Sequence, residues 1–189
     1  RSDIIDYNGH ASVRLDGDRL LINIGSCQRS SLTVDDICTI DFEGNVLEGK
    51  GRPPLEFHLH VGIYRARADI RAVVHAHPKW STFLSMVGEG YKPVYAQGSL
   101  VYPMPVLDSP NSINNPAMAR RLADTLADRP AAMMKSHGAV TVGKDVWVGS
   151  EFIGQKCTLS QFLAAPIGSC GATRTAFANW YTRISKITP

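Results

Sequence analysis

The stretch of sequence that decides the fold is Ala72-Val-Val-His-Ala-His-Pro78. Its apolar first half predicts a buried strand, and the closing proline ends that strand directly after the second histidine. Because successive side chains of a strand point to opposite faces, His75 and His77 are expected on the same face. Two imidazoles held side by side on rigid backbone make half of a metal site, although such a pair alone is more often a hydrogen-bonded part of the core.

Two further segments favour the metal interpretation. A second apolar run, Met133-Met-Lys-Ser-His-Gly138, also ends in a histidine, His137. Upstream, Glu56 and His60 lie one turn apart on a predicted helix. Three neutral imidazoles from the two runs suit Zn²⁺ or another divalent first-row ion, and they leave coordination positions open for a substrate.

The remaining pattern predicts strands mixed with helices. Strands are expected near residues 10–14, 19–23, 37–42, 46–47, 69–77, 131–134 and 139–142, and helices near residues 55–67, 79–86 and 115–127. Residues 94–95 and 100–106 are expected to be extended, and the buried side of the first helix to consist of Leu55, Leu59, Gly62 and Ile63. This mixture points to a single α/β domain with a central mixed or antiparallel sheet flanked by helices.

Composition narrows the class of protein. The 189 residues are 44% hydrophobic and 20% charged, as in ordinary globular domains, and a net charge of +3 without a basic patch argues against nucleic acid as a partner. No apolar stretch approaches the length of a membrane span. The four cysteines lack the C-x-x-C spacing of a zinc ribbon or a redox pair, so a reducing, cytoplasmic location is expected. The chain begins with Arg1 and is open to being a fragment.

Several ordered motifs resemble those of one known family. They are Gly9-His-Ala-Ser-Val-Arg14, Leu32-Thr-Val-Asp-Asp36, Glu56-Phe-His-Leu-His60, Ile63-Tyr-Arg-Ala-Arg67, the 72–78 stretch, Lys135-Ser-His-Gly138 and Val142-Gly-Lys-Asp145. In this order they resemble the class II aldolase/adducin family, which includes sugar-phosphate aldolases and epimerases. The resemblance implies a class II aldolase-like domain over residues 1–145. Residues 146–189 form a C-terminal tail that departs from the family pattern, where a long helix normally follows.

The resemblance implies roles for the site residues. The histidines that match the family's metal ligands are His75, His77 and His137, and they would hold one divalent ion, Zn²⁺ by preference, with Mn, Fe or Co as alternatives. The matching glutamate is Glu56, which would lie at the metal and transfer protons, whereas its position alone favours a solvent-facing carboxylate at a helix start.

Two other histidines on the same helix have less certain roles in the sequence. His60 is either a partner that orients a site residue or a core histidine packed beneath the site. His58 is expected to be exposed, because it lies two residues from both Glu56 and His60.

The expected ion indicates the reaction. A hydroxy-ketone or hydroxy-acid can chelate a cation through adjacent oxygens, and breaking the neighbouring carbon–carbon bond leaves a carbanion delocalised as an enediolate, which a Lewis acid stabilises. Glu56 then delivers or removes the proton. Aldol cleavage and decarboxylation share this logic and differ in the leaving fragment, an aldehyde or CO₂.

The residues around the expected pocket favour decarboxylation. Sugar-phosphate members of the family grip the phosphate with an Asn, a Thr-Gly or Ser-Gly pair and a Ser-Ser pair; the matching positions here are His10, the loop Asn23-Ile-Gly-Ser-Cys27 and Pro54-Leu55. Losing hydroxyls and an amide removes donors that a phosphate needs. A decarboxylase branch of the family, which acts on hydroxylated aromatic carboxylates, also has His at the first position.

A rim of small and basic residues is the expected substrate contact. It consists of His10, Gly25, Ser26 and Arg29, with backbone N–H groups of the loop as further anion donors. Arg14 is another possible donor, although an ordinary strand role is as good an interpretation.

The sequence therefore predicts a metal-dependent carbon–carbon lyase, with decarboxylation of a non-phosphorylated hydroxy-carboxylate favoured. The alternatives are a sugar-phosphate aldolase or 4-epimerase of the same family, and a non-catalytic adducin-like binding domain, which should have lost metal ligands. The expected partners are a small-molecule substrate and further copies of the chain, as a homo-oligomer that is a tetramer by resemblance.

Overall fold

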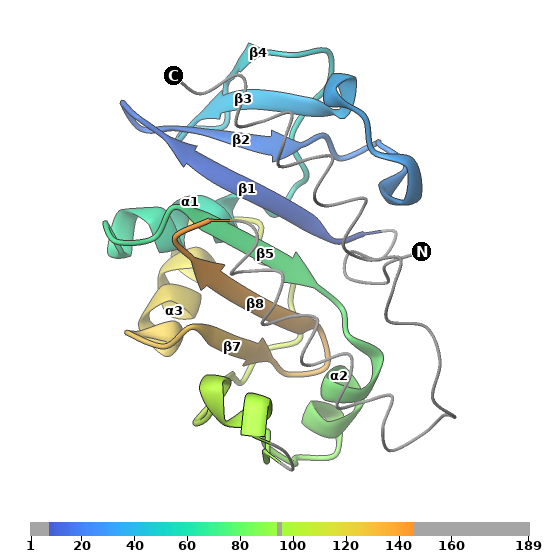
Figure 1. Cartoon of the computed structure of the whole chain (residues 1–189), viewed down its shortest axis with the longest axis vertical. Coiled ribbons are helices and arrows are strands. Elements are labelled where there is room, and N and C mark those ends of the chain that lie inside the picture. Colours follow the sequence, from blue (N-terminus) through green and yellow to red (C-terminus); the bar gives the residue numbers. More distant parts are fainter. Residues whose placement is uncertain (1–7, 94–95, 146–189) are drawn as a thin grey trace.

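The computed structural model describes residues 8–93 and 96–145. Its centre is an eight-stranded sheet with the order β4-β3-β2-β1-β5-β8-β7-β6 (Figure 1). Neighbouring strands are antiparallel except for β6 and β7, which pair in parallel. The sheet is therefore mixed and flanked by helices, which confirms the predicted fold class.

The elements follow the predicted order along the chain. The strands are β1 (His10–Leu15), β2 (Arg19–Asn23), β3 (Ile37–Asp41), β4 (Val46–Glu48), β5 (Ala72–Ala76), β6 (Val106–Leu107), β7 (Ala131–Met134) and β8 (Gly138–Gly143). The α-helices are α1 (Phe57–Ala66), α2 (Lys79–Met86) and α3 (Pro116–Leu126), and the 3₁₀ helices are η1 (Arg29–Ser31), η2 (Val34–Asp36) and η3 (Ala96–Val101).

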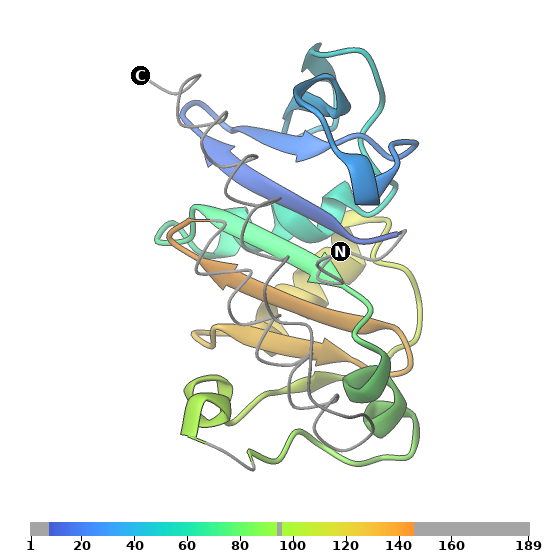
Figure 2. The same cartoon turned by 45° about the vertical axis from the view of Figure 1, so that its right-hand side comes forward.

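Helices α1 and α3 cover the same face of the sheet, behind the strands in Figures 1 and 2. Between them and the sheet lies the main core, to which α1 contributes Leu59 and Ile63 and α3 contributes Leu122 and Leu126. The helices approach closely at Gly62, where a Cβ atom would lie 2.7 Å from the Cβ of Ala119. A side chain at that position would force the two helices apart.

Strand pairing decides where the candidate site lies. β5 runs through the middle of the sheet between β1 and β8, with His10 opposite His75 on one side and Val140 opposite His75 on the other. The end of β5 therefore meets the start of β1 and the start of β8. Segments that are more than 60 residues apart in sequence become neighbours at this point.

Three local predictions were wrong. The first helix begins at Phe57 rather than residue 55, and Leu55 is 82% exposed instead of buried, because the Phe57 N–H donates to the Pro54 carbonyl in a turn that precedes the helix. The segment expected to be extended over residues 100–106 contains the end of η3 and only the start of β6. The strand expected over residues 69–77 is limited to β5, so His77 follows the strand.

Two predictions fall outside the described residues, namely the extended pair 94–95 and the tail from residue 146 onward. Within residues 8–93 and 96–145, none of the helices has the length and apolar character that crossing a lipid bilayer requires.

Candidate functional site

Four side chains that are distant in sequence converge at the end of β5. Glu56 is the residue before α1, His75 lies in β5, His77 follows that strand, and His137 lies in the turn between β7 and β8. One potential ligand atom from each of the four lies within 4.8 Å of the others. The structure thus brings together all of the residues that the sequence predicted as metal ligands and proton-transfer group.

Backbone carbonyls fix the tautomers of two of these histidines. His75 Nδ1 lies 3.0 Å from the Ala139 carbonyl oxygen, and His137 Nδ1 lies 3.2 Å from the Asn111 carbonyl oxygen. A carbonyl only accepts, so in each neutral ring Nδ1 carries the proton and Nε2 carries the lone pair. This is the orientation that metal-binding histidines adopt.

The donor set fits a divalent first-row cation. His75 Nε2 lies 3.1 Å from His77 Nε2, so two imidazole nitrogens face each other at a distance that a shared proton or cation would stabilise. The imidazole nitrogens together with the Glu56 carboxylate match the nitrogen and oxygen ligands of zinc and its neighbours.

Glu56 is held as a carboxylate with little access to solvent. Its side chain is 12% exposed, and the Ile113 N–H donates to Oε1 at 2.8 Å. Burial favours the neutral acid, but the surrounding imidazoles of His10, His137 and His75 outweigh burial and hold the pKa of Glu56 below its usual range. The side chain is therefore ionised, which is the form in which a carboxylate can act as a proton acceptor.

Burial divides the histidines into two classes. It lowers the pKa of His10 below 6.5, and those of His60 and His75 well below 6.5, because a protonated ring would lose its hydration. At His137 burial acts in the same direction, but the hydrogen bond and negative charge of Glu56 outweigh it and raise the pKa. His75 is therefore neutral, as binding a metal requires.

His60 combines the two roles that the sequence left open. It is completely buried, and its Nε2 lies 2.7 Å from His10 Nδ1. Its Nδ1 lies 2.6 Å from Ser12 Oγ, which in turn lies 2.7 Å from the Tyr64 hydroxyl. Ser12 and Tyr64 were not predicted from the sequence, although Ser12 lies two residues after His10 on a strand and Tyr64 lies four residues after His60 on a helix.

The four residues that were predicted to form a substrate rim lie in different surroundings in the structure. His10 is 1% exposed and lies beneath Glu56, with Nε2 3.4 Å from Oε2. Gly25 and Ser26 are exposed in the loop after β2. Arg29 is turned toward that loop, where Nε donates to the Gly9 carbonyl and Nη1 donates to the carbonyls of Gly25 and Cys27.

Two further basic residues lie away from the cluster. Arg14 Nη1 donates to the Tyr64 carbonyl at 2.8 Å and to the Arg67 carbonyl at 3.5 Å, at the end of α1. His58 was expected to be exposed and is partly buried, because its ring packs against the Phe57 ring with the two ring centroids 4.0 Å apart. The position of Arg14 supports its strand role.

The family model for the Class II Aldolase and Adducin N-terminal domain matches residues 5–148. The chain belongs to this family. The predicted resemblance is confirmed, and so is the prediction of a carbon–carbon lyase, an aldolase or a decarboxylase, at the level of the family.

Two relatives from different branches are equally similar to the chain. An L-fuculose phosphate aldolase from Methanocaldococcus jannaschii is 32% identical over 149 residues, which cover 77% of this chain and 78% of the relative. A 3,4-dihydroxyphthalate decarboxylase from Arthrobacter keyseri is 31% identical over 157 residues, which cover 73% of this chain and 61% of the relative. These identities favour neither branch.

A solved structure supports the fold. The aldolase II superfamily protein from Pseudomonas syringae aligns with a TM-score of 0.75 at 17% identity, over 97% of this chain and 86% of that chain. At this identity the likeness shows the shared fold alone.

We expect acid to destabilise the metal-free protein through His60. Its pKa in the folded state is well below 6.5, so below pH 6.5 the unfolded chain binds a proton that the folded chain does not. This contribution to stability is complete above pH 6.5 and falls by about 1.4 kcal/mol for each pH unit below it. Urea unfolding in EDTA at pH 7.5 and 5.5 measures the loss, and the His60→Gln variant should show a smaller one. An equal loss in both proteins would contradict the burial of a neutral His60.

Proposed function

We propose that the chain is a metal-dependent carbon–carbon lyase in which His75, His77 and His137 hold one divalent cation beside Glu56. The observation that carries the proposal is the convergence of three imidazoles, two of them with Nδ1 at hydrogen-bond distance from a backbone carbonyl oxygen. Zinc is the preferred ion, with manganese, iron and cobalt as alternatives for the same donor set.

The residues around the cation would divide the chemistry. A divalent ion bound there supplies Lewis acidity, which stabilises negative charge on a chelating substrate. The Glu56 carboxylate accepts a proton from a substrate hydroxyl group. When the carbon–carbon bond breaks, its electron pair stays on the substrate carbon and CO₂ leaves. Glu56 then returns its proton to that carbon, so the carboxylate is restored.

The reaction that we favour is decarboxylation of a non-phosphorylated hydroxy-carboxylate, a class that includes aromatic hydroxy-carboxylates. The support is that the cationic donors proposed for a phosphate are used within the protein: His10 beneath Glu56, Arg14 at the end of α1, and Arg29 on the loop carbonyls. Gly25 and Ser26 are the members of the predicted rim that are exposed to solvent, and we propose that they contact the substrate.

The second candidate function is a sugar-phosphate aldolase or 4-epimerase. It is favoured by an L-fuculose phosphate aldolase that is 32% identical to this chain, which is comparable to the 31% of a 3,4-dihydroxyphthalate decarboxylase. A non-catalytic adducin-like binding domain ranks below both, because the four-residue cluster is complete.

The ligand roles predict a selective loss of metal. His77→Ala or His137→Ala should weaken Zn²⁺ binding by more than about 100-fold, since each removes an imidazole from the cluster. His58→Ala should bind Zn²⁺ as the wild type does, because His58 lies outside the cluster. Competition with a chromophoric chelator measures the affinities. A wild-type protein that binds no divalent ion would support the adducin-like alternative instead.

The substrate class is tested by thermal shift of the zinc-loaded protein, because a ligand of the native state raises its melting temperature. We expect hydroxylated aromatic carboxylates to stabilise the protein and to release CO₂ on incubation. In the CO₂-release assay the Glu56→Gln variant should retain its metal and show a kcat that is lower by about 10²- to 10⁴-fold. Stabilisation by dihydroxyacetone phosphate or pentulose phosphates alone would move aldol cleavage to first place.

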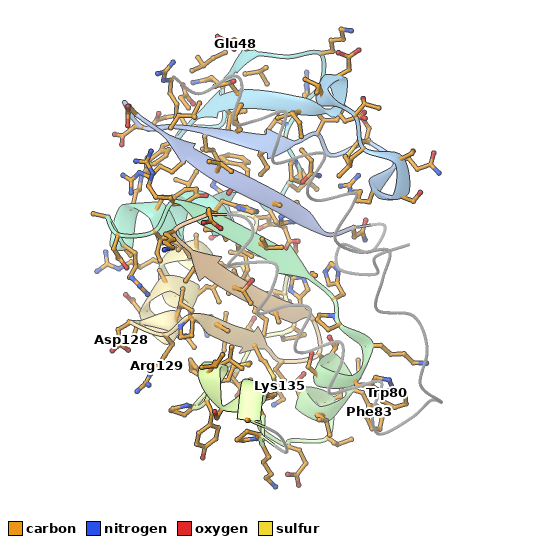
Figure 3. The ribbon with its side chains drawn as sticks, viewed as in Figure 1. Glu48, Trp80, Phe83, Asp128, Arg129 and Lys135 are labelled. Carbon is orange, nitrogen blue, oxygen red and sulfur yellow. The ribbon has the colours of Figure 1, made fainter. Side chains whose placement is uncertain are left out.

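The proposal includes an oligomer. Exposed apolar side chains gather on α2 and directly after it, among them Phe83, Met86 and Val87, each about half exposed, with Trp80 beside Phe83 (Figure 3). This surface supports the predicted homo-oligomer, a tetramer by resemblance. Sedimentation velocity of the wild type is expected to show four chains of 20.6 kDa, and a monomer would contradict it.

Two other predictions are kept as parts of the proposal. The catalytic domain is proposed to occupy residues 1–145, with residues 146–189 as a separate tail. A cytoplasmic location is supported by Cys27 and Cys38, which are both free thiols.

A further inference from the structure

A line of buried polar side chains runs from Glu56 along the inner side of α1. In order they are His10, His60, Ser12 and Tyr64, here called the buried polar chain. Ser12 and His60 are completely buried, and His10 and Tyr64 are 1% exposed. Successive polar atoms from His10 to Tyr64 lie 2.6–2.7 Å apart, and His10 Nε2 lies 3.4 Å from the carboxylate.

The line exists because two regular spacings coincide. Glu56, His60 and Tyr64 are each four residues apart, which is about 6.0 Å along a helix. His10 and Ser12 are two residues apart on the same face of β1, which is about 6.6–6.8 Å along a strand. The side chains of α1 and β1 therefore alternate, and each bridges the gap between two from the other element.

The chain has a fixed direction because the Glu56 carboxylate at its near end can only accept a hydrogen bond. His10 Nε2 lies 3.4 Å from Oε2 and therefore carries the proton, which leaves Nδ1 of the neutral ring as an acceptor. His60 donates to that nitrogen from Nε2, so His60 Nδ1 accepts from the Ser12 hydroxyl. Ser12 in turn accepts from the Tyr64 hydroxyl.

The direction determines the tautomers of both histidines. His10 and His60 each carry the proton on Nε2 and accept at Nδ1. In the opposite direction His10 Nε2 would be unprotonated, and its lone pair would face the Glu56 carboxylate oxygen at 3.4 Å.

We propose that the buried polar chain positions the Glu56 carboxylate, with His10 as the positioning residue that holds Oε2 while the Ile113 amide holds Oε1. His10 then acts through Glu56, whereas the sequence predicted that it contacts the substrate. The role given to Glu56 rests on the proposed lyase function, whereas the tautomers and the direction of the chain do not.

Ring ¹⁵N spectra of histidine-labelled, metal-free protein test the direction without a substrate. Each nitrogen reports whether it carries a proton. We expect His10 and His60 to be protonated on Nε2 and unprotonated on Nδ1 at pH 7.5. A spectrum in which either residue is the Nδ1–H tautomer overturns the proposal.

Variants test whether the residues act as one chain. Ser12→Ala removes the donor to His60 Nδ1 and should change the ring ¹⁵N signals of His10, which Ser12 does not touch. Tyr64→Phe should change the signals of His60. The matched control is Tyr91→Phe. Tyr91 is a buried tyrosine in a separate apolar cluster, and its hydroxyl donates to the Gly98 carbonyl. Removing this hydroxyl should change the ring ¹⁵N signals of neither His10 nor His60.

Two results distinguish failure of the inference from failure of the proposed function. If Ser12→Ala alters only His60, or if His10 responds equally to Tyr91→Phe, the chain is an ordinary buried cluster and the inference fails. If the tautomers are as expected but Glu56→Gln retains full turnover, the chain stands and the lyase role of Glu56 fails. With a substrate identified, Ser12→Ala should lower kcat by about 10-fold and leave KM within twofold. Should a variant not fold, the wild-type tautomers still decide.

Discussion

A carboxylate with 12% of its side chain exposed is the constraint on which the site depends. Removing a charge from water is costly unless donors replace the lost hydration. The fold supplies them from two directions: the Ile113 amide, in the segment before α3, and the His10 ring on β1. The burial of Glu56 therefore ties the helical layer to the sheet.

The site also requires several imidazoles to reach one point, and the central position of β5 in the sheet makes this possible. β5 has neighbours on both sides, so the Ala139 carbonyl of β8 can orient His75 while His10 of β1 stands opposite. A strand at the edge of the sheet would lack one of these neighbours. The turn between β7 and β8 then brings His137 to the same end, and Gly138 leaves the space this needs, because a Cβ there would lie 2.5 Å from the Ala76 carbonyl oxygen.

Much of the fold and of the cluster could be predicted from the sequence, because the information is local or carried by ordered motifs. The apolar run of β5 and the proline after His77 fix a strand end, and the helical spacing of α3 fixes its buried side. The prediction that Leu55 lies on the buried side of the first helix was wrong, because the Pro53-Pro54 turn delays the start of that helix. The burial of His10 was not foreseen, since it depends on which face of β1 meets α1, and this is a tertiary property.

The two spacings between polar side chains, one along α1 and one along β1, are close but not equal. They differ by roughly 0.7 Å at each step, so alignment holds only over a few residues. One step beyond Ser12, Arg14 lies over the Tyr64 ring and donates its hydrogen bonds to the backbone carbonyls of Tyr64 and Arg67. The length of the polar line is thus limited by geometry. A single-residue insertion in β1 would turn the side chains beyond it to the opposite face of the sheet, so the polar line tolerates no change in the length of that strand.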